Sequence, residues 1–390
     1  MEVKNTTTTA NTLAKKNILF LSMHLGLGGS EGQTTSLLNG LDAKDFNLHL
    51  IYFTPFDLES NYINHTNLVS FQCVEKKSKF DLSAFFKIKD FIIKNNIDIV
   101  FCVDEFPFLM GFLARLLCNK SFKLITCIHH TKPQYGLWIK FKDLIYHRLL
   151  RKNDEVIFVS ENQKNYWLEE NGIPSKISTV IHNGINVQLF TYDNSEQQRA
   201  DLKEQIGFAQ DHFIVGINAV LRKGKRHEDL IDAIKLCHKY NLKISACIIG
   251  QGVQRKTIKN YILQHEMQDY IKMVGFQKDV RPYIKLCDCM CLPSDSEAFS
   301  MSILEAMCMG KIVLSTEVGG ANEVIDDGVN GYLFQPGDVK RLVELILSVA
   351  QNKNNTEQQE MQMKAKKVIY DNFSVEVMVN KYKLFFQSLT

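Results

Sequence analysis

Two glutamates, Glu297 and Glu305, flank the predicted start of a helix that ends at Gly310. Small polar residues of the kinds that cap helices precede it, and apolar residues at helical spacing follow. Periodicity alone does not put both carboxylates on one helix face, so they converge only if the loop carrying Glu297 folds back over the helix N-terminus. The N–H groups and positive dipole end there suit an anionic ligand. The alternative is a solvated loop glutamate and a surface helix glutamate.

A run of cations at residues 222–226 forms a second candidate site. Its members Arg222, Lys223, Lys225 and Arg226 come shortly after a predicted strand. At the carboxyl end of a strand, arginine can hold a diphosphate through paired hydrogen bonds, and lysine can neutralise it as a point charge. A solvated loop is the alternative, and it is the commoner origin of a charge run.

A glycine-rich turn at residues 26–32, which includes Gly28 and Gly29, follows the first predicted strand and opens a helix. Its N–H groups could cradle an anion, although the spacing matches neither a dinucleotide fingerprint nor a P-loop. A purely structural tight turn explains it equally well. His129 and His130 stand at the end of another predicted strand, where they could reach a substrate hydroxyl or transfer a proton.

The segment 132–152 interleaves basic and aromatic residues and contains a single acid, Asp143. Such a helix could lie on an anionic membrane surface. The alternative is an amphipathic surface helix whose aromatic side chains face the core, because the segment lacks a wide, wholly apolar face.

Short apolar runs alternate with helical segments along the chain, which predicts parallel, doubly wound α/β sheets. The polar stretch 191–211 interrupts this series and predicts a linker. We therefore expect a disordered leader at 1–16, Rossmann-like domains at 17–190 and 212–373, and a final helix at 374–390. The predicted strands are 18–21, 48–53, 97–103, 123–128, 155–159 and 177–181, then 213–219, 243–249, 270–274, 287–292 and 311–315.

Composition narrows the function classes. A net charge of +3 over 390 residues gives no concentrated basic footprint for nucleic acid. The ten cysteines are too sparse for a disulfide scaffold, and the alternating Cys287, Cys289 and Cys291 predict core packing rather than a metal site. No apolar run is long enough for a signal sequence or a membrane span, so we expect a cytoplasmic protein.

Several segments in order resemble the retaining glycosyltransferases of family 4, which have the GT-B fold. Glu297 to Glu305 looks like the family's E-x7-E region, and the likeness extends over nearly the whole chain from Ile18. The other matching segments are Gly28–Glu31, Val159–Glu161, Ile181–Asn186, Ala219–Arg222 with Lys225 and His227, Gly319–Glu323 and Asp327–Leu333.

The resemblance implies two domains facing across a cleft, the first binding the acceptor and the second a nucleotide-diphosphate sugar. Arg222 and Lys225 would hold the diphosphate and stabilise the leaving group without a metal. Glu297 would accept hydrogen bonds from the donor sugar, and Glu305 from the ribose. His129 would touch the donor sugar.

Further contacts follow from the same resemblance. Backbone N–H groups of Phe299, Ser300 and Met301 would contact the sugar and phosphate, Gly28 and Gly29 would approach the diphosphate, and the base would lie near Gly275 and Phe276. The expected donor is a UDP-sugar, and the acceptor a glycan or lipid-linked molecule in cell-surface polysaccharide or lipopolysaccharide synthesis. The final helix would cross back onto the first domain.

Two residues depart from the family pattern. Ala298 stands where glycine is usual, which restricts the backbone. His182 stands where proline is common, and we expect little consequence. A nucleotide-sugar epimerase, a phosphorylase and a non-catalytic sugar-nucleotide-binding module remain as alternatives on the same fold.

Overall fold

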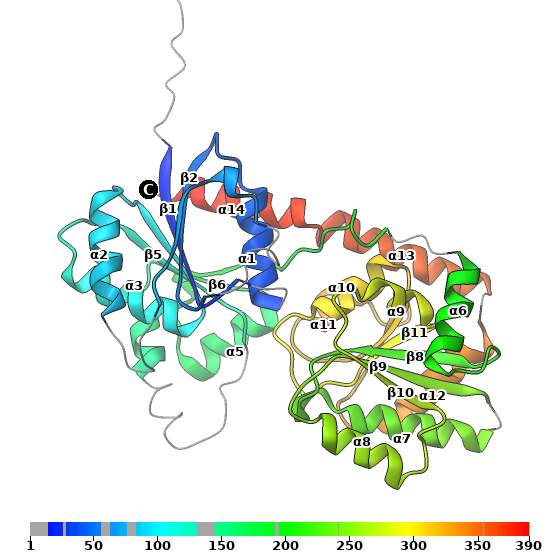
Figure 1. The fold of residues 1–390 in the computed structure, drawn as a ribbon. Helices are drawn as coiled ribbons and strands as arrows, with labels where there is room; N and C mark the ends of the chain where they lie inside the picture. Colours follow the sequence, from blue (N-terminus) through cyan, green and yellow to red (C-terminus); the bar gives the residue numbers. More distant parts are fainter. Residues whose placement is uncertain are drawn as a thin grey trace, which may run out of the picture. The chain divides into compact units, whose positions relative to one another are not determined.

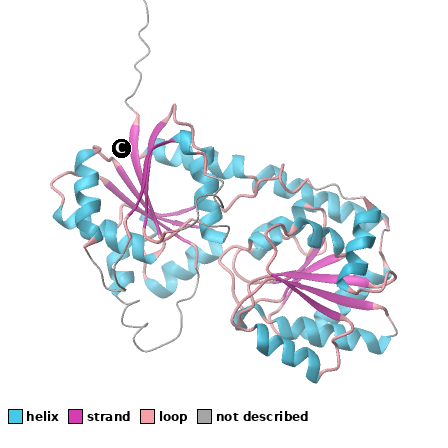
Figure 2. Cartoon of the chain, in the orientation of Figure 1, coloured by secondary structure: helices cyan, strands magenta, loops and turns pink. Residues whose placement is uncertain are grey.

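The computed structural model describes residues 15–25, 29–55, 63–75, 83–130, 145–191, 195–240, 242–353 and 355–389. Its contacts divide the chain into two compact units, Met1–Thr126 and Cys127–Thr390. Two sheets carry the fold, and helices cover both faces of each sheet (Figures 1 and 2). The α/β prediction is therefore confirmed, whereas the predicted domain boundaries stay predictions.

The first sheet has the strand order β3-β2-β1-β4-β5-β6-β7. Its neighbouring pairs β1·β2, β1·β4, β2·β3 and β6·β7 are parallel. Strands β1 and β4 read as continuous apolar runs because helices bury both of their faces. The strands are β1 Lys16–Ser22, β2 Phe46–Tyr52, β3 Leu68–Cys73, β4 Ile99–Val103, β5 Lys123–Ile128, β6 Glu155–Phe158 and β7 Ser178–Val180, and the helices are α1 Gly29–Gly40, α2 Ala84–Lys94, α3 Glu105–Leu117 and α5 Glu161–Asn171.

The second sheet has the order β10-β9-β8-β11-β12-β13, and all its neighbouring strands are parallel. The central strand β8 ends at Asn218, so the loops that follow β8, β11 and β12 meet at one edge, where ligands of such sheets bind. The strands are β8 Phe213–Asn218, β9 Ile244–Ile249, β10 Ile271–Gly275, β11 Cys289–Leu292, β12 Ile312–Thr316 and β13 Tyr332–Phe334. The α-helices are α6 Glu196–Ile206, α7 His227–Cys237, α8 Arg255–Gln264, α9 Arg281–Leu286, α10 Met301–Cys308, α11 Ala321–Val324, α12 Val339–Gln351, α13 Thr356–Asn372 and α14 Val375–Ser388.

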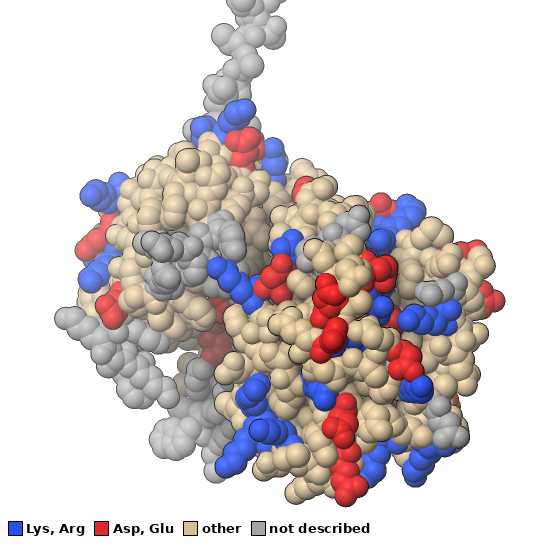
Figure 3. Space-filling model, turned by 45° about the vertical axis from the view of Figure 1, so that its right-hand side comes forward, with Lys and Arg blue, Asp and Glu red and all other residues tan. Residues whose placement is uncertain are grey.

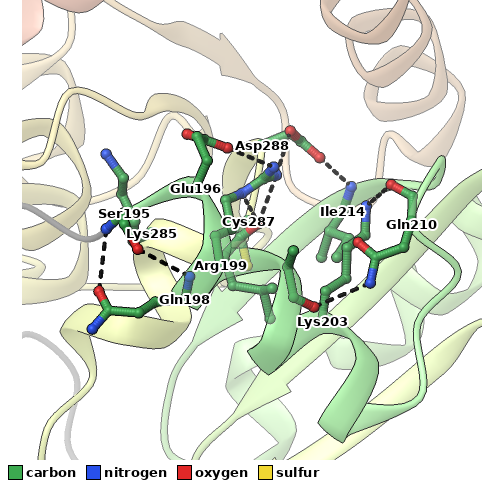
Figure 4. Close-up of polar contacts among 12 residues, drawn as sticks. Ser195, Glu196, Gln198, Arg199, Lys203, Gln210, Ile214, Lys285, Cys287 and Asp288 are labelled. Carbon is green, nitrogen blue, oxygen red and sulfur yellow. Dashed lines mark hydrogen bonds and ion pairs between the residues drawn. The ribbon is translucent and has the colours of Figure 1, made fainter.

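The predicted linker segment contains helix α6, which the sequence reading did not anticipate. Ser195 and Gln198 form a capping box at its start. Arg199 donates to the Leu286 carbonyl and to Asp288, whose other carboxylate oxygen accepts from the N–H of Ile214 at the start of β8 (Figure 4). These bonds attach α6 to the second sheet.

The last helix, α14, contacts residues of the first sheet. Ile185, which follows β7, exchanges backbone hydrogen bonds with Phe373 and Val375. The Tyr382 hydroxyl lies 3.5 Å from the Cys127 sulfur in β5. The sequence predicts an apolar stripe of Met378, Tyr382, Phe385 and Phe386 on this helix, and the structure buries all of them except Phe385, which is half-buried. The expected return of the last helix to the first domain is confirmed.

Two other predictions concern buried thiols and membranes. Cys287, Cys289 and Cys291 are buried and unpaired, as core packing requires. Within the described residues, no helix has both the length and the apolar character needed to span a bilayer. Most of the basic and aromatic segment 132–152 lies outside the described residues, which resume at Ile145.

Candidate active site

The candidate site is built on the loop that joins β8 to α7. This loop turns sharply at Arg226, which has a positive φ of 48°. The Arg226 guanidinium bonds both carboxylate oxygens of Asp229, at 2.7 and 3.0 Å, and also reaches Asp295 at 3.1 Å. Its hydrogen bonds to Asp229 raise the Arg226 pKa. Arg226 is therefore committed to holding the loop, which leaves the other cations to bind a ligand.

Lys225 and Glu297 form a direct ion pair, and each side chain is about 10% exposed or less. The loop carrying Glu297 is docked on this segment, because the Asp295 N–H donates to the Gly224 carbonyl at 2.9 Å. Behind it, Gly319 has a φ of +55°, and a Cβ there would lie 1.9 Å from the Glu297 carbonyl oxygen. Only glycine fits such a contact. Glu297 is thus held from two sides.

Arg222 differs from Lys225 and Arg226 because its side chain is exposed. Its backbone is fixed, with N–H donating to Val220 at 2.8 Å and the carbonyl accepting from Lys225 at 3.0 Å. Within the described part of the chain, the Arg222 guanidinium has neither a hydrogen bond nor an ion pair. A guanidinium on a fixed backbone next to a buried Lys–Glu pair can accept a diphosphate.

Glu305 lies inside α10 and contacts Asn218 at the end of β8. The Asn218 amide donates to the Glu305 carboxylate at 2.8 Å, and Ser302 donates to the Asn218 carbonyl at 2.6 Å. Burial raises the Glu305 pKa to about 7, and the Asn218 hydrogen bond acts in the opposite direction. The two glutamates therefore contact opposite ends of the same segment, 218–225.

The residues between the glutamates start α10. Ser300 occupies the N-cap position, but its side chain does not cap the helix, and Met301 is the first helical residue. Phe299 is buried against the rings of His182 and Phe373, at centroid distances of 5.3 and 5.7 Å. The start of α10 thus lies directly after the loop that carries Glu297.

His129 follows strand β5, and helix α5 fixes the backbone on either side of it. The Gln163 amide donates to the carbonyls of Ile128 and His130, both at 2.9 Å. His129 Nε2 lies 3.8 Å from the Cys127 sulfur. Sequence reasoning missed Gln163 because α5 itself was not predicted.

The remaining predicted residues are carried by other elements. Gly275 ends β10, two strands from β8, with a φ of +77°, and the next residue, Phe276, is 64% exposed. A surface pocket of about 520 Å³ between α6, α8 and β10 is lined by Gln277 but by no predicted site residue. Gly29 begins α1 in the other unit, and Gly28 lies outside the described residues.

One further contact was missed from the sequence. Glu323 accepts hydrogen bonds from the N–H groups of Glu161 and Asn162 and from His182. Burial acts to raise the Glu323 pKa, but these hydrogen bonds outweigh it and lower the pKa. His182 therefore has a specific partner, whereas the expected small consequence of this departure from the family pattern stays a prediction.

Charge and metal ligands add two findings. Lys and Arg side chains are interspersed with Asp and Glu on the face that Figure 3 shows, as the small net charge predicts. Among the residues that the structure describes, no group of three or more His, Cys, Asp or Glu could hold a metal ion. The expected independence of metal stays a prediction.

Comparison with known proteins gives two family matches. Residues 198–368 match the sequence model described as Glycosyl transferases group 1, and residues 27–189 match Glycosyltransferase Family 4. N-acetyl-alpha-D-glucosaminyl L-malate synthase of Bacillus anthracis is 25% identical, over 93% of this chain and 94% of its own length. The Escherichia coli O-antigen biosynthesis glycosyltransferase WclY is 21% identical, over 85% and 90%.

Solved structures show the same fold. Anabaena HepE, crystallised with UDP-glucose, superposes with a TM-score of 0.81 at 21% identity, over 96% of this chain and 100% of its own. Sucrose-phosphate synthase of Thermosynechococcus elongatus superposes with a TM-score of 0.78 at 17% identity, over 96% and 98%. The two sheets thus have the arrangement of strands and helices found in GT-B enzymes.

Proposed function

Because the chain belongs to the group 1 and family 4 glycosyltransferases, we propose that it transfers a sugar from a nucleoside diphosphate to a glycan or lipid-linked acceptor, with retention of anomeric configuration. A UDP-sugar is the proposed donor, since HepE was crystallised with UDP and with UDP-glucose. Cell-surface polysaccharide or lipopolysaccharide synthesis is the proposed context, since WclY and the amylovoran enzyme AmsK of Erwinia amylovora act in such pathways by name.

One observation carries the proposal: the loop that follows β8 holds both the exposed Arg222 and the buried Lys225–Glu297 pair, and the Lys225 N–H donates to the Arg222 carbonyl at 3.0 Å. As the bond between sugar and phosphate breaks, negative charge grows on the leaving diphosphate. Cations fixed in advance stabilise that charge without reorganising. Arg222 and Lys225 have the chemistry for this role, and neither needs a metal ion.

The two glutamates read hydroxyl groups of the donor. Glu297 accepts hydrogen bonds from the hydroxyl groups of the sugar. Glu305, when it is ionised, accepts hydrogen bonds from the hydroxyl groups of the ribose. Because Lys225 pairs with Glu297, that carboxylate is a poor nucleophile. Retention then proceeds by attack of the acceptor on the face that the diphosphate leaves, and a phosphate oxygen takes the acceptor proton.

The other predicted residues complete the donor site. His129 touches the sugar, and the N–H groups of Phe299, Ser300 and Met301 bind sugar and phosphate at the start of α10. Gly28 and Gly29 approach the diphosphate, and Gly275 with Phe276 contacts the base. The positive φ at Gly275 supports a role for its backbone rather than for a side chain.

A thermal-shift screen tests donor binding, because a ligand that binds only the folded state raises the melting temperature. Nucleoside diphosphates are screened first and their sugars second, and transfer to acceptors is then assayed. UDP and one UDP-sugar should raise the melting temperature more than the other nucleotides do. If epimerised donor or free sugar forms without an acceptor, the protein is an epimerase or a hydrolase rather than a transferase. If the donor binds but no product forms, the protein is a non-catalytic binding module.

Arg222→Ala should lower kcat for transfer by about 10²–10³-fold, the loss typical of one removed electrostatic group. Arg341→Ala is the matched control, because Arg341 is an exposed residue of α12 that pairs with Glu344. Both variants should melt near the wild-type temperature. Turnover of Arg222→Ala close to that of the control would exclude the proposed role.

The enzyme is further proposed to work at the cytoplasmic face of the membrane, with residues 132–152 providing peripheral contact. The mixture of basic and aromatic residues in that segment supports the proposal. The protein should sediment with anionic vesicles at low salt and stay in solution at high salt. It should not sediment with neutral vesicles.

A further inference from the structure

The first turn of α5, residues Ser160–Gln163, bonds to segments that the proposed function places on two sides of the donor sugar. We call it the α5 turn. On one side, Gln163 is fully buried and its amide holds the carbonyls of Ile128 and His130. The Gln163 side-chain oxygen also accepts from the Val159 N–H at 2.8 Å. The backbone that carries His129 is therefore fixed by α5.

On the other side, the α5 turn holds the loop that carries Glu297. The Ser160 hydroxyl accepts from the Gln163 N–H at 3.1 Å, which caps α5, and donates to the Ala298 carbonyl at 2.8 Å. The Gly320 N–H donates to the same carbonyl at 3.1 Å. The carbonyl of Ala298, the residue after Glu297, therefore accepts two hydrogen bonds, one of them from α5.

Glu323 joins the α5 turn to this loop. Its carboxylate accepts from the N–H groups of Glu161 and Asn162, both at 3.0 Å, so an anion from a distant segment occupies the positive end of α5. His182 Nε2 lies 2.7 Å from the same carboxylate and must donate, because an ionised carboxylate only accepts.

The connection from Glu323 back to Glu297 is short. The Asn162 amide donates to the Gly319 carbonyl and to Asn322, at 2.5 and 2.6 Å. Gly319 in turn packs so closely on the Glu297 carbonyl that no Cβ fits between them. A shift of Glu323 relative to α5 therefore moves Gly319, the residue that packs against the Glu297 carbonyl.

We propose that Glu323 is a positioning residue, which acts through the α5 turn to set His129 and Glu297 for the donor sugar. This inference rests on the proposed function, because it concerns the sugar contacts of that same site. Glu323 itself does not touch the substrate. No hydrogen bond among the described residues joins the α5 turn to Arg222 or Glu305. Glu323 therefore governs recognition of the sugar and not that of the nucleotide.

The test is Glu323→Gln, which keeps the side-chain shape but removes the charge and presents an amide to the two N–H groups. Loss of a charge-assisted network should weaken UDP-glucose binding and raise its KM by about tenfold. UDP affinity should stay within about twofold of wild type. Glu317→Gln is the matched control, since Glu317 lies in the connection that precedes α11 and its carboxylate accepts a hydrogen bond only from Gln335 among the described residues.

A second measurement needs no donor. Hydrogen exchange of the free protein should rise by about threefold or more at 297–301 and at 128–130 in Glu323→Gln, and not in Glu317→Gln. If Glu323→Gln folds poorly, His182→Phe removes one donor while keeping a ring against Phe299 and Phe373, and it should produce smaller changes in the same direction.

The outcomes separate cleanly. Unchanged exchange at 297–301, or equal losses of UDP and UDP-glucose affinity, would overturn the positioning role. A wild-type protein that binds UDP and transfers a sugar, but whose Glu323→Gln variant behaves like the control, would overturn this inference alone. A wild-type protein that binds no nucleoside diphosphate would overturn the proposed function, and the sugar-positioning role with it.

Discussion

The two ends of the 218–225 segment treat a glutamate in opposite ways. At one end Lys225 meets Glu297 with a full positive charge, so the carboxylate is paired. At the other end Glu305 meets only the Asn218 amide, and burial raises its pKa to about 7. Near neutral pH, therefore, Glu305 is poised between two protonation states, whereas Glu297 has a lysine as its direct partner.

This difference matches the two ligand parts proposed for them. In the proposed site the sugar and diphosphate lie where charge develops, and Lys225, fixed by its pairing with Glu297, offers a cation to the leaving diphosphate without reorganising. The ribose is neutral and stays uncharged throughout the reaction. A carboxylate that recognises it needs no cation nearby, and burial can tune it without affecting the leaving group.

Breaking the ion pair from the lysine side should have the largest effect. Lys225→Met removes the cation that pairs with the buried Glu297 carboxylate, which should lower the free energy of unfolding by about 3 kcal/mol. Transfer should fall by about 10²–10³-fold because a leaving-group cation is lost. Urea unfolding and kcat measure the two effects.

The double variant Lys225→Met/Glu297→Gln separates stability from chemistry. Removing the Glu297 charge as well should restore most of the lost stability and none of the lost transfer. If the double variant is no more stable than Lys225→Met, the ion pair is not the source of the destabilisation.

Glu305, at the other end of the segment, should make the free energy of unfolding depend on pH. The Glu305 pKa is higher in the folded protein than its usual value of 4.5, so the folded state holds the proton more tightly. Its contribution to stability is present below about pH 4.5 and is lost as the pH rises towards 7. Glu305→Gln removes this loss and should be more stable than wild type at pH 8, by up to about 3 kcal/mol.

Donor binding should respond with the opposite sign. In the proposed site ionised Glu305 accepts hydrogen bonds from ribose, so wild-type affinity for UDP should rise as the pH increases through about 7. Glu305→Gln should flatten that rise, whereas Glu344→Gln, which changes an exposed glutamate of α12, should keep it. Calorimetry at pH 6, 7 and 8 compares the three proteins, and an unchanged rise in Glu305→Gln would remove Glu305 from the ribose site.

The sequence predicted these two glutamates and the cations because the local patterns were strong. Strands buried on both faces are continuous apolar runs in the sequence. Helix α10 follows residues of the types that cap helices and has an apolar period, although the Ser300 side chain makes no cap hydrogen bond. The partners were beyond reach, since Lys225 and Glu297 lie 72 positions apart and only the fold brings them together. The same reason hid the contact between Glu323 and α5.

Helices α5 and α6 were missed for a different reason. Both are polar, and α5 buries only Gln163 and Trp167, so neither has an apolar period to detect. A signal was present all the same. Ser160 precedes Gln163 and Ser195 precedes Gln198 with the spacing of a capping box, which marks a helix start even where the helix is polar.

Replacing Asn218, the hydrogen-bond partner of Glu305, should have the smallest of these effects. Its hydrogen bond lowers the Glu305 pKa against the effect of burial, so Asn218→Ala should raise that pKa further above 7. The net strength of one hydrogen bond to a charged group corresponds to a shift of about one pH unit. The rise of UDP affinity should therefore occur about one unit higher in Asn218→Ala than in wild type, and at pH 9 the two proteins should bind UDP similarly. An equal loss of affinity at every pH would instead mean that Asn218 contacts the nucleotide itself, and the amide would then join the ribose site as a ligand rather than as a partner of Glu305.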